Sequence, residues 1–268
     1  MTPLTIYAGL AADRNARGMR GARILGEALS AIVGKTARVV GAAAAPVPGG
    51  WAEQLATARA DLGLLKQAIG EVLDAGLRPL SVMGRCAASV ATLPAVARRH
   101  PEAVVVWFDA HGDCNVPRGA DSYLGGMVLT GAAGLWDTGL GADLALAQVI
   151  LVGSRDLDPP EMDRIARGEL GHVRAGAGLA ARLAAAVHGR PVYVHIDCDV
   201  LDAGLLATEY QVPDGLSFAQ LREACAVLAA CPLIGLEITE YEGAWPDGQP
   251  SGADGLLEAI APLLAALA

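Results

Sequence analysis

Short apolar runs alternate along the chain with longer stretches in which apolar and charged residues recur at helical spacing. The apolar runs have the length of strands, and eight are expected to form β-strands: 4–9, 37–41, 78–84, 103–110, 148–154, 171–175, 191–199 and 232–239. Helices are expected between most of them, the clearest over 18–33, 51–75, 87–100, 176–188 and 217–230. This alternation predicts parallel strands joined by right-handed crossovers.

The element order predicts one α/β domain over residues 1–268, with an open, mainly parallel sheet of about eight strands between two helical layers. Hydrophobic residues make up 53% of the chain and aromatic residues only 4%. The core must therefore consist of Ala, Val, Leu and Ile, as is usual when helices cover both faces of a parallel sheet. Ligands bind at the carboxyl ends of the strands in such sheets, so functional residues are expected directly after the strands.

The net charge and the cysteine content limit which binding partners and which cellular compartment are expected. The net charge of −9 argues against a nucleic-acid partner, which requires clustered Lys and Arg. No uninterrupted run of 18 apolar residues predicts a membrane span, and no basic segment precedes the first apolar run as in a signal peptide. The five cysteines form no CxxC motif. These features favour a reduced, cytoplasmic protein with a small-molecule substrate.

Two acidic motifs follow the fourth and seventh expected strands. In FDAHGDCN, Asp109, His111 and Asp113 are spaced by two residues, and HIDCDVLD repeats this spacing with Asp197 and Asp199. Residues two apart in an extended chain point to the same side. Each motif is therefore expected to present its acidic side chains together at the carboxyl edge of the sheet.

Four carboxylates and an imidazole at one sheet edge predict bound cations, because the carboxylates would otherwise repel one another strongly. Oxygen-rich sites with one or two imidazoles suit Mn²⁺, and could also hold Fe, Co or Ni. Two divalent ions about 3.5–4 Å apart can share a water and convert it to hydroxide near neutral pH. Solvated loop acids are the alternative, but two such motifs directly after strands favour a metal site.

These motifs resemble those of the ureohydrolase family, which includes arginase, agmatinase and formiminoglutamase. The family pattern DAHxDxN matches residues 109–115, and DxDxxD matches 197–202. VGSRDLDPPE at 152–161 resembles the arginase segment GxRDxDPxE, and GLEITEYEG resembles the segment before the arginase EVNP. The resemblance covers about residues 78–242. It implies an arginase-like fold with an open, eight-stranded parallel sheet and a centre of two Mn²⁺ ions.

The resemblance also implies which residues hold the two ions. Asp109 and Asp197 would bridge them, Asp113 would complete one ligand set, and His111 and Asp199 would complete the other. The full implied set of metal ligands is Cys86, Asp109, His111, Asp113, Asp197 and Asp199.

Several positions depart from the family pattern. The segment GGDH, whose histidine is a metal ligand, reads MGRC here, so Cys86 replaces that histidine. We interpret Cys86 as a substituted ligand, and the alternative is a nearby thiol that leaves its metal under-coordinated. Gly125 stands where the family has an active-site histidine, and a polar contact of the family would come here from Tyr210 or Gln211. His195 is a candidate for proton exchange, with a structural role beside the metal as the alternative.

The resemblance also implies the residues that bind substrate. Asn115 corresponds to the arginase residue that binds the α-carboxylate, and Asp158 and Glu161 correspond to those that reach the α-amino group. Glu240 corresponds to the residue that contacts the guanidinium. These residues favour an α-amino acid over agmatine, which has no carboxylate. DLDPPE also looks like a helix start, so Asp158 and Glu161 are candidates for helix capping as well.

Cys86 bears on the choice of substrate. A thiolate is softer than imidazole and adds negative charge, whereas hard donors suit Mn²⁺. We therefore expect a weaker Lewis acid, on which L-arginine is a poor substrate. An N-hydroxyguanidine is a weaker base with a better-activated leaving group, so its hydrolysis would be slowed less. One family member of similar length that has this cysteine hydrolyses Nω-hydroxy-L-arginine in D-cycloserine biosynthesis.

The resemblance thus implies a hydrolase that converts Nω-hydroxy-L-arginine into hydroxyurea and L-ornithine for antibiotic biosynthesis. A metal-bridging hydroxide would attack the guanidino carbon, Asp113 would orient it and protonate the leaving amine, and Glu240 would hold the guanidine head. Two alternatives remain open: an arginase or agmatinase that tolerates the cysteine, and a metal-poor, non-catalytic family member. The sequence does not determine the oligomeric state.

Overall fold

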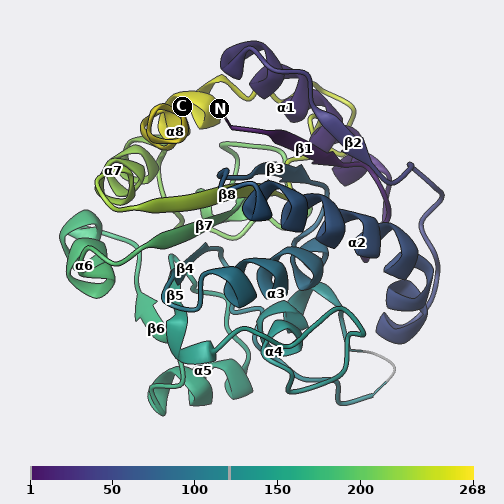
Figure 1. Cartoon of the computed structure of the whole chain (residues 1–268), viewed down its shortest axis with the longest axis horizontal. Coiled ribbons are helices and arrows are strands. Elements are labelled where there is room, and N and C mark those ends of the chain that lie inside the picture. The colour runs from purple at the N-terminus through teal and green to yellow at the C-terminus, as the bar shows by residue number, and fades with distance from the viewer. Residues whose placement is uncertain (1, 120–121) are drawn as a thin grey trace.

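An open sheet of eight parallel strands forms the centre of the molecule, as the sequence predicts (Figure 1). The computed structural model describes residues 2–119 and 122–268. Asp121, which with Ser122 and Tyr123 stands where the resembled arginases have Ser-Gly-Asn, lies outside the described residues. The strand order across the sheet is β2-β1-β3-β8-β7-β4-β5-β6. The strands are β1 (Leu4–Tyr7), β2 (Arg38–Val40), β3 (Leu80–Met83), β4 (Val104–Phe108), β5 (Val149–Val152), β6 (Gly171–Val173), β7 (Val192–Asp197) and β8 (Leu233–Thr239).

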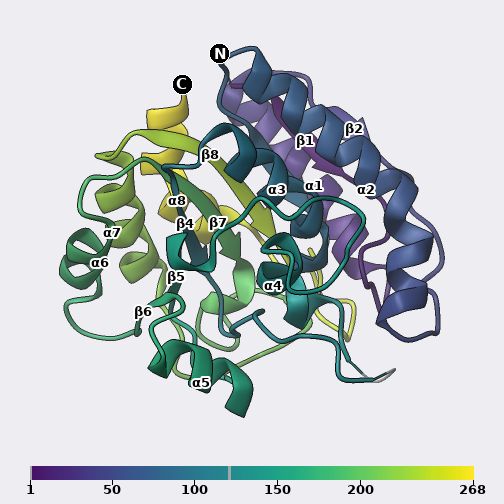
Figure 2. The same cartoon turned by 60° about the horizontal axis from the view of Figure 1, so that its bottom comes forward.

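Helices cover both faces of this sheet (Figure 2). On one face, a core of aliphatic side chains joins the strands to α1 (Arg17–Val33), α6 (Leu179–Val187), α7 (Phe218–Ala229) and α8 (Asp254–Leu267). On the other face, a second core includes α2 (Trp51–Asp74), α3 (Ser89–Arg99) and α4 (Val128–Ala132). Every residue of β4 and β7 is buried, which explains why β4 is apolar throughout and why β7 is apolar up to His195, with no alternation of exposed polar residues. Among the described helices, none is long and apolar enough to cross a membrane.

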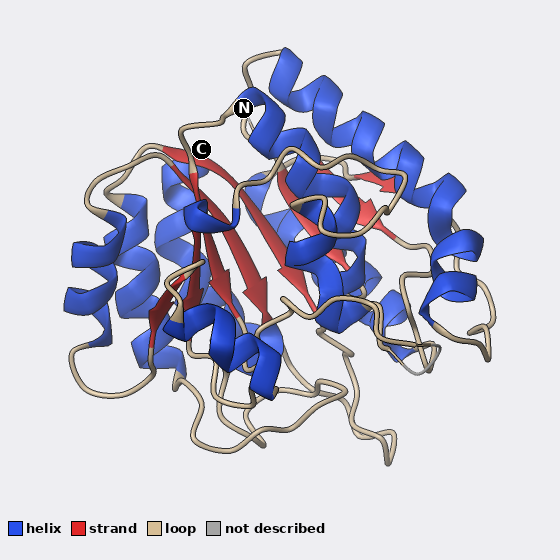
Figure 3. Cartoon of the chain, turned by 90° about the horizontal axis from the view of Figure 1, so that it is seen from below, coloured by secondary structure: helices blue, strands red, loops and turns tan. Residues whose placement is uncertain are grey.

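The strand order creates a switch point at the middle of the sheet. β3 and β4 are consecutive along the chain, but β8 and β7 lie between them. Ligand sites form at such points, where the order of the strands across a parallel sheet reverses. The carboxyl ends of β3, β8, β7 and β4 lie side by side and face the loops at the lower edge of the molecule (Figure 3).

Candidate metal centre and active site

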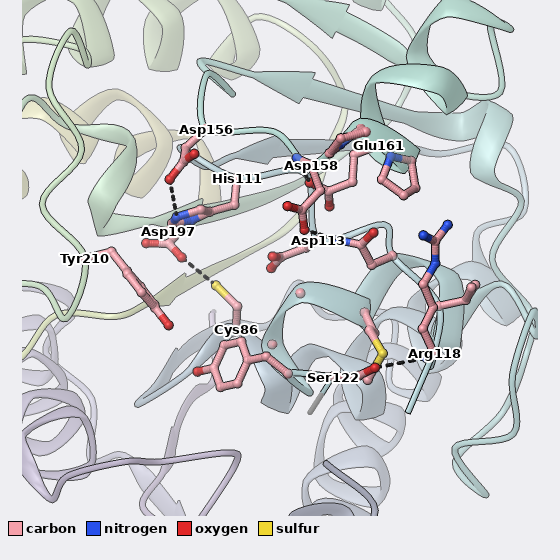
Figure 4. Close-up of a pocket in the computed structure, with 18 of the residues that line it drawn as sticks. Cys86, His111, Asp113, Arg118, Ser122, Asp156, Asp158, Glu161, Asp197 and Tyr210 are labelled. Carbon is pink, nitrogen blue, oxygen red and sulfur yellow. Dashed lines mark hydrogen bonds and ion pairs between the residues drawn. The ribbon is translucent and has the colours of Figure 1, made fainter. Parts of the chain in front are cut away.

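The four central strands bring the acidic motifs to one place (Figure 4). Asp109 directly follows β4, Asp197 ends β7, and Glu240 directly follows β8. After β3, a 3₁₀ turn begins at Cys86. The chain is not extended between Asp197 and Asp199, contrary to the sequence expectation. It enters a 3₁₀ turn over Cys198–Val200, in which the Asp199 N–H donates a hydrogen bond of 2.8 Å to Asp197 Oδ1.

One part of the centre is the His111 half, which comprises Asp109, His111 and Asp199. Their candidate ligand atoms all lie within 4.8 Å of one another. His111 Nδ1 is 3.2 Å from Asp109 Oδ1 and 3.2 Å from Asp199 Oδ2. The His111 side chain is 24% exposed, so this half opens toward solvent.

The other part is the Cys86 half, which comprises Cys86, Asp197 and Glu240 and is almost wholly buried. Their candidate ligand atoms again lie within 4.8 Å of one another, and Cys86 forms a further such group with Asp109 and His195. The Cys86 thiol donates to Asp197 Oδ2 at 2.8 Å, and Cys86 Sγ lies 3.3 Å from His195 Nε2. Asp109 thus belongs to a group in each half.

His195 is held in place by residues that the sequence reasoning did not identify. Its Nδ1 lies 2.8 Å from Glu237 Oε1, and the ring stacks on Trp107 with 3.4 Å between centroids. Thr92 and Tyr193 also donate to Glu237, at 2.6 and 2.7 Å. Burial disfavours the charge on Glu237, but these hydrogen bonds hold its pKa below the usual value. His195 is wholly buried, which favours a positioning role over proton exchange with solvent.

Crowding of buried acids shows why this site would hold cations. Burial, followed by the neighbouring carboxylates, raises the pKa of Asp113, Asp197 and Asp199 above the usual value. The same causes raise the pKa of the Cys86 thiol. Groups in this situation must bind protons or cations. A donor set of carboxylates, imidazole and thiol fits divalent transition metals, so the residues present fit the two ions that the family pattern implies.

Asp113 and Glu240 have left-handed backbone conformations at the site, with φ of 47° and 64°. Such conformations cost about 1–3 kcal/mol in non-glycine residues and are concentrated at functional sites. Both side chains line the pocket. Burial, opposed by Arg85, raises the pKa of Glu240 to about 7. Asp113 joins none of the three ligand groups that the described residues form, so its role as a metal ligand stays a prediction.

A pocket of about 780 Å³ opens over both halves and extends to α5 (Pro159–Ala166). On that side, the Asn115 amide donates to Asp158 Oδ2 at 2.9 Å, and both residues line the pocket. The Glu161 carboxylate accepts the N–H groups of Cys114 and Asp158, each at 3.0 Å. The expected capping role is thus confirmed, because Asp158 is the N-cap residue of α5 and forms a capping box with Glu161. Asn115, Asp158 and Glu161 all line the pocket, and their role in binding substrate stays a prediction.

A sequence model of the arginase family matches residues 16–249 of the chain. The chain belongs to the arginase family. The Nω-hydroxy-L-arginine amidinohydrolase of Streptomyces lavendulae is 38% identical over 265 residues, which cover 98% of this chain and 95% of that relative. An arginase of Schizosaccharomyces pombe is 27% identical over 196 residues, or 66% of this chain and 60% of that enzyme. The chain is therefore an amidine hydrolase of this family.

Solved structures agree with the fold. The arginase of Entamoeba histolytica in complex with L-ornithine superposes with a TM-score of 0.82 at 20% identity, with 98% of each chain covered. The proclavaminate amidinohydrolase of Streptomyces clavuligerus superposes with a TM-score of 0.71 at 20% identity, covering 99% of this chain and 89% of that enzyme. At these identities the likeness establishes the fold alone.

Gly125, where the resemblance predicts an active-site histidine, lies beside the ring of Tyr123. A Cβ atom at Gly125 would lie 2.5 Å from Cε1 of Tyr123, so the tyrosine ring fills the space beside it. Arg14 stacks over this ring at 4.4 Å and donates to the Tyr210 hydroxyl at 2.6 Å. Tyr210 lines the pocket as expected, whereas Gln211 binds the loop residues around it.

Arg85 is a further residue that the sequence analysis did not identify as part of the site. It stands where the resembled family segment GGDH has an aspartate, and it directly precedes Cys86. The side chain is wholly buried, and its guanidinium contacts the Glu240 carboxylate at 2.6 Å. A charged residue at the end of a buried strand was the available signal, because such residues are rarely buried without partners.

Proposed function

We propose that this protein is a Mn²⁺-dependent amidinohydrolase that cleaves Nω-hydroxy-L-arginine into hydroxyurea and L-ornithine. The observation that carries the proposal is the Cys86 thiol in the ligand cluster, which lies 2.8 Å from Asp197 and lines the pocket. A sulfur donor makes a weaker Mn²⁺ centre than imidazole would, and a weaker centre favours the more activated substrate. The name of the Streptomyces lavendulae relative supports the same substrate.

Bound Mn²⁺ ions would lower the pKa of a shared water and polarise the guanidine group. The residues proposed to hold the ions are Cys86, Asp109, His111, Asp113, Asp197 and Asp199. Hydrogen bonds from the backbone and from Trp107 fix both Asp109 oxygens, because Oδ1 accepts the His111 N–H and Oδ2 accepts the Trp107 indole. This carboxylate is therefore oriented before any ion binds.

The remaining pocket residues would bind and protonate the substrate. Glu240 would accept hydrogen bonds from the guanidine head, and Asn115 and Asp158 would bind the amino-acid end. Asp113 would carry a proton to the leaving ornithine amine. The position of its side chain in the pocket lining supports this role. No imidazole at position 125 is then required.

The cellular setting is proposed on the same resemblance. Hydroxyurea release would supply antibiotic biosynthesis, for which we propose the D-cycloserine pathway. The five cysteines are all free, which is consistent with a reduced, cytoplasmic setting.

The decisive test is a product assay on Mn²⁺-loaded protein with each substrate. We expect kcat/KM for Nω-hydroxy-L-arginine, measured as hydroxyurea, to exceed that for L-arginine, measured as urea, by at least about 100-fold. A higher kcat/KM on L-arginine would instead identify an arginase. Fewer than one Mn²⁺ per chain, with no hydrolysis of either compound, would identify a non-catalytic member.

A further inference from the structure

Arg85 is buried against four carboxylates beside the metal centre. Its Nε lies 3.2 Å from Asp13, its Nη1 lies 2.6 Å from Glu240, and its Nη2 lies 2.9 and 3.0 Å from Glu209 and Glu242. The guanidinium is charged at any working pH, so it is a fixed cation inside this cluster. It is itself a guanidinium bound to the carboxylate that is proposed to bind the guanidine head of the substrate.

The Glu240 carboxylate therefore already accepts hydrogen bonds before substrate binds. Oε2 accepts Arg85 Nη1 at 2.6 Å, and Oε1 accepts the Cys86 N–H at 2.8 Å. A carboxylate has about four acceptor positions, so two are already used. Arg85 does not line the pocket, so it acts from behind Glu240.

The position of Arg85 is fixed by close packing against α1. A Cβ atom on Gly18 of α1 would lie 2.9 Å from Cζ of Arg85 and 2.8 Å from the Gly84 carbonyl oxygen. Glycine at this position therefore lets α1 pack closely against the guanidinium. Helix packing and four carboxylates together hold Arg85 in one position.

We propose that Arg85 is a positioning residue that sets substrate preference by partly neutralising Glu240. A nearby fixed cation weakens the attraction of Glu240 for the cationic guanidinium of L-arginine. The head of Nω-hydroxy-L-arginine is a weaker base, so it loses less from the same repulsion. This inference rests on the proposed function, in which Glu240 receives the substrate head, and it adds a second origin of selectivity beside Cys86.

Arg17 provides a matched control. Its Nε lies 2.6 Å from Glu242 Oε2, so it is a second cation of the same cluster. Among the contacts that the structure describes, Arg17 does not reach Glu240. Arg17→Gln therefore removes a cluster charge without releasing the carboxylate that faces the substrate.

The experiment compares Arg85→Gln, the charge-matched Arg85→Gln/Glu242→Gln, Arg85→Lys and Arg17→Gln, each checked by circular dichroism. For L-arginine we measure KM, or the inhibition constant if it is not hydrolysed. In the two Arg85→Gln variants we expect this constant to fall about tenfold, while KM for Nω-hydroxy-L-arginine changes less than about threefold. Arg85→Lys and Arg17→Gln should both keep the wild-type preference.

Equal changes for both compounds, or an unchanged preference in the charge-matched double variant, would overturn the inference, because a purely structural role would affect both compounds alike. The two proposals can fail separately. If the wild type hydrolyses neither compound, the proposed function fails. Calorimetric binding of the same two compounds to the same variants still decides the role of Arg85.

Discussion

The two halves of the candidate metal centre are built differently. The His111 half keeps the arginase-family pattern and opens into the pocket, with His111 also 3.9 Å from the exposed Asp156. The Cys86 half departs from the pattern and is buried, and Cys86 Sγ has Asp197, His195 and Thr239 within 3.3 Å. A ligand lost without compensation would leave its neighbours unpaired. Here the altered residue has three polar contacts, which argues for a modified centre rather than a decayed one.

The largest effect should come from the residue that joins the halves. Asp109→Asn keeps the shape of the side chain but removes the charge shared by both ligand groups. Loss of a residue behind a metal ligand costs about 10–100-fold in affinity, so this change should cost more than about 100-fold for both ions. Metal content by mass spectrometry and hydroxyurea release measure it. Retention of one full ion per chain would show that the halves bind metal independently.

The second-largest effect should come from Glu237, which orients His195 beside Cys86. Glu237→Gln weakens the orientation of His195, whose Nδ1 lies 2.8 Å from Glu237. We expect a loss of about 10–100-fold in Mn²⁺ affinity confined to the Cys86 half. Titration of Mn²⁺ into metal-free protein should then resolve one weakened and one unchanged site. Glu223→Gln, an exposed carboxyl on α7, is the control, and equal weakening of both sites would contradict the assignment.

Much of the fold could be predicted from the sequence, because its strands are continuous apolar runs and its helices have regular spacing. All eight expected strands are present, and α5 begins at Pro159 as DLDPPE indicates. The short helix α4 was not expected, since a five-residue apolar segment has no periodicity to detect. The turn at Cys198 was also not expected. There the Asp197 side chain accepts a hydrogen bond from the backbone N–H two residues ahead, and this ends the strand early.

The metal motifs were visible in the sequence because their spacing is local, whereas their supports were not. Glu237 reads as one polar residue in an apolar strand, and only the pairing of β7 with β8 places it beside His195. Arg85 meets partners that are 72 to 157 residues away along the chain. Tyr123 blocks the space beside Gly125 through the folding of a loop. Contacts of this kind depend on the tertiary structure and leave no periodic signal.

The halves should also differ in how they respond to pH without metal. Burial raises the pKa of both Asp197 and Asp199 above the usual carboxyl value. Asp197 is the more strongly raised, because only the Cys86 thiol opposes the rise there, whereas His111 and the Ala110 N–H both oppose it at Asp199. Between the unfolded and folded pKa values, the metal-free native state binds more protons than the unfolded state. Its stability therefore falls as pH rises, by about 1.4 kcal/mol per pH unit for each extra proton.

Thermal unfolding of metal-free and Mn²⁺-loaded protein between about pH 5.5 and about pH 8 tests this linkage. The stabilisation by Mn²⁺ should increase with pH, since cations replace the protons. Asp197→Asn should reduce this pH dependence more than Asp199→Asn does. A Mn²⁺ effect independent of pH would show that the buried acids hold no extra protons.

The smallest expected effect comes from exchanging one ligand for another. Cys86→His restores the family residue, so the Cys86 half gains a neutral, harder donor and no ligand is lost. We expect firmer Mn²⁺ binding in that half and a preference for Nω-hydroxy-L-arginine that falls by about three- to tenfold, or roughly 1 kcal/mol. The imidazole must fit beside His195 and Thr239, which limits the gain. Cys225→Ser, a buried thiol on α7 outside the pocket, is the control. If Cys86→His leaves metal content and preference unchanged, Cys86 is a neighbour of the ions rather than a ligand, and the selectivity of this half must come from Arg85 and Glu240.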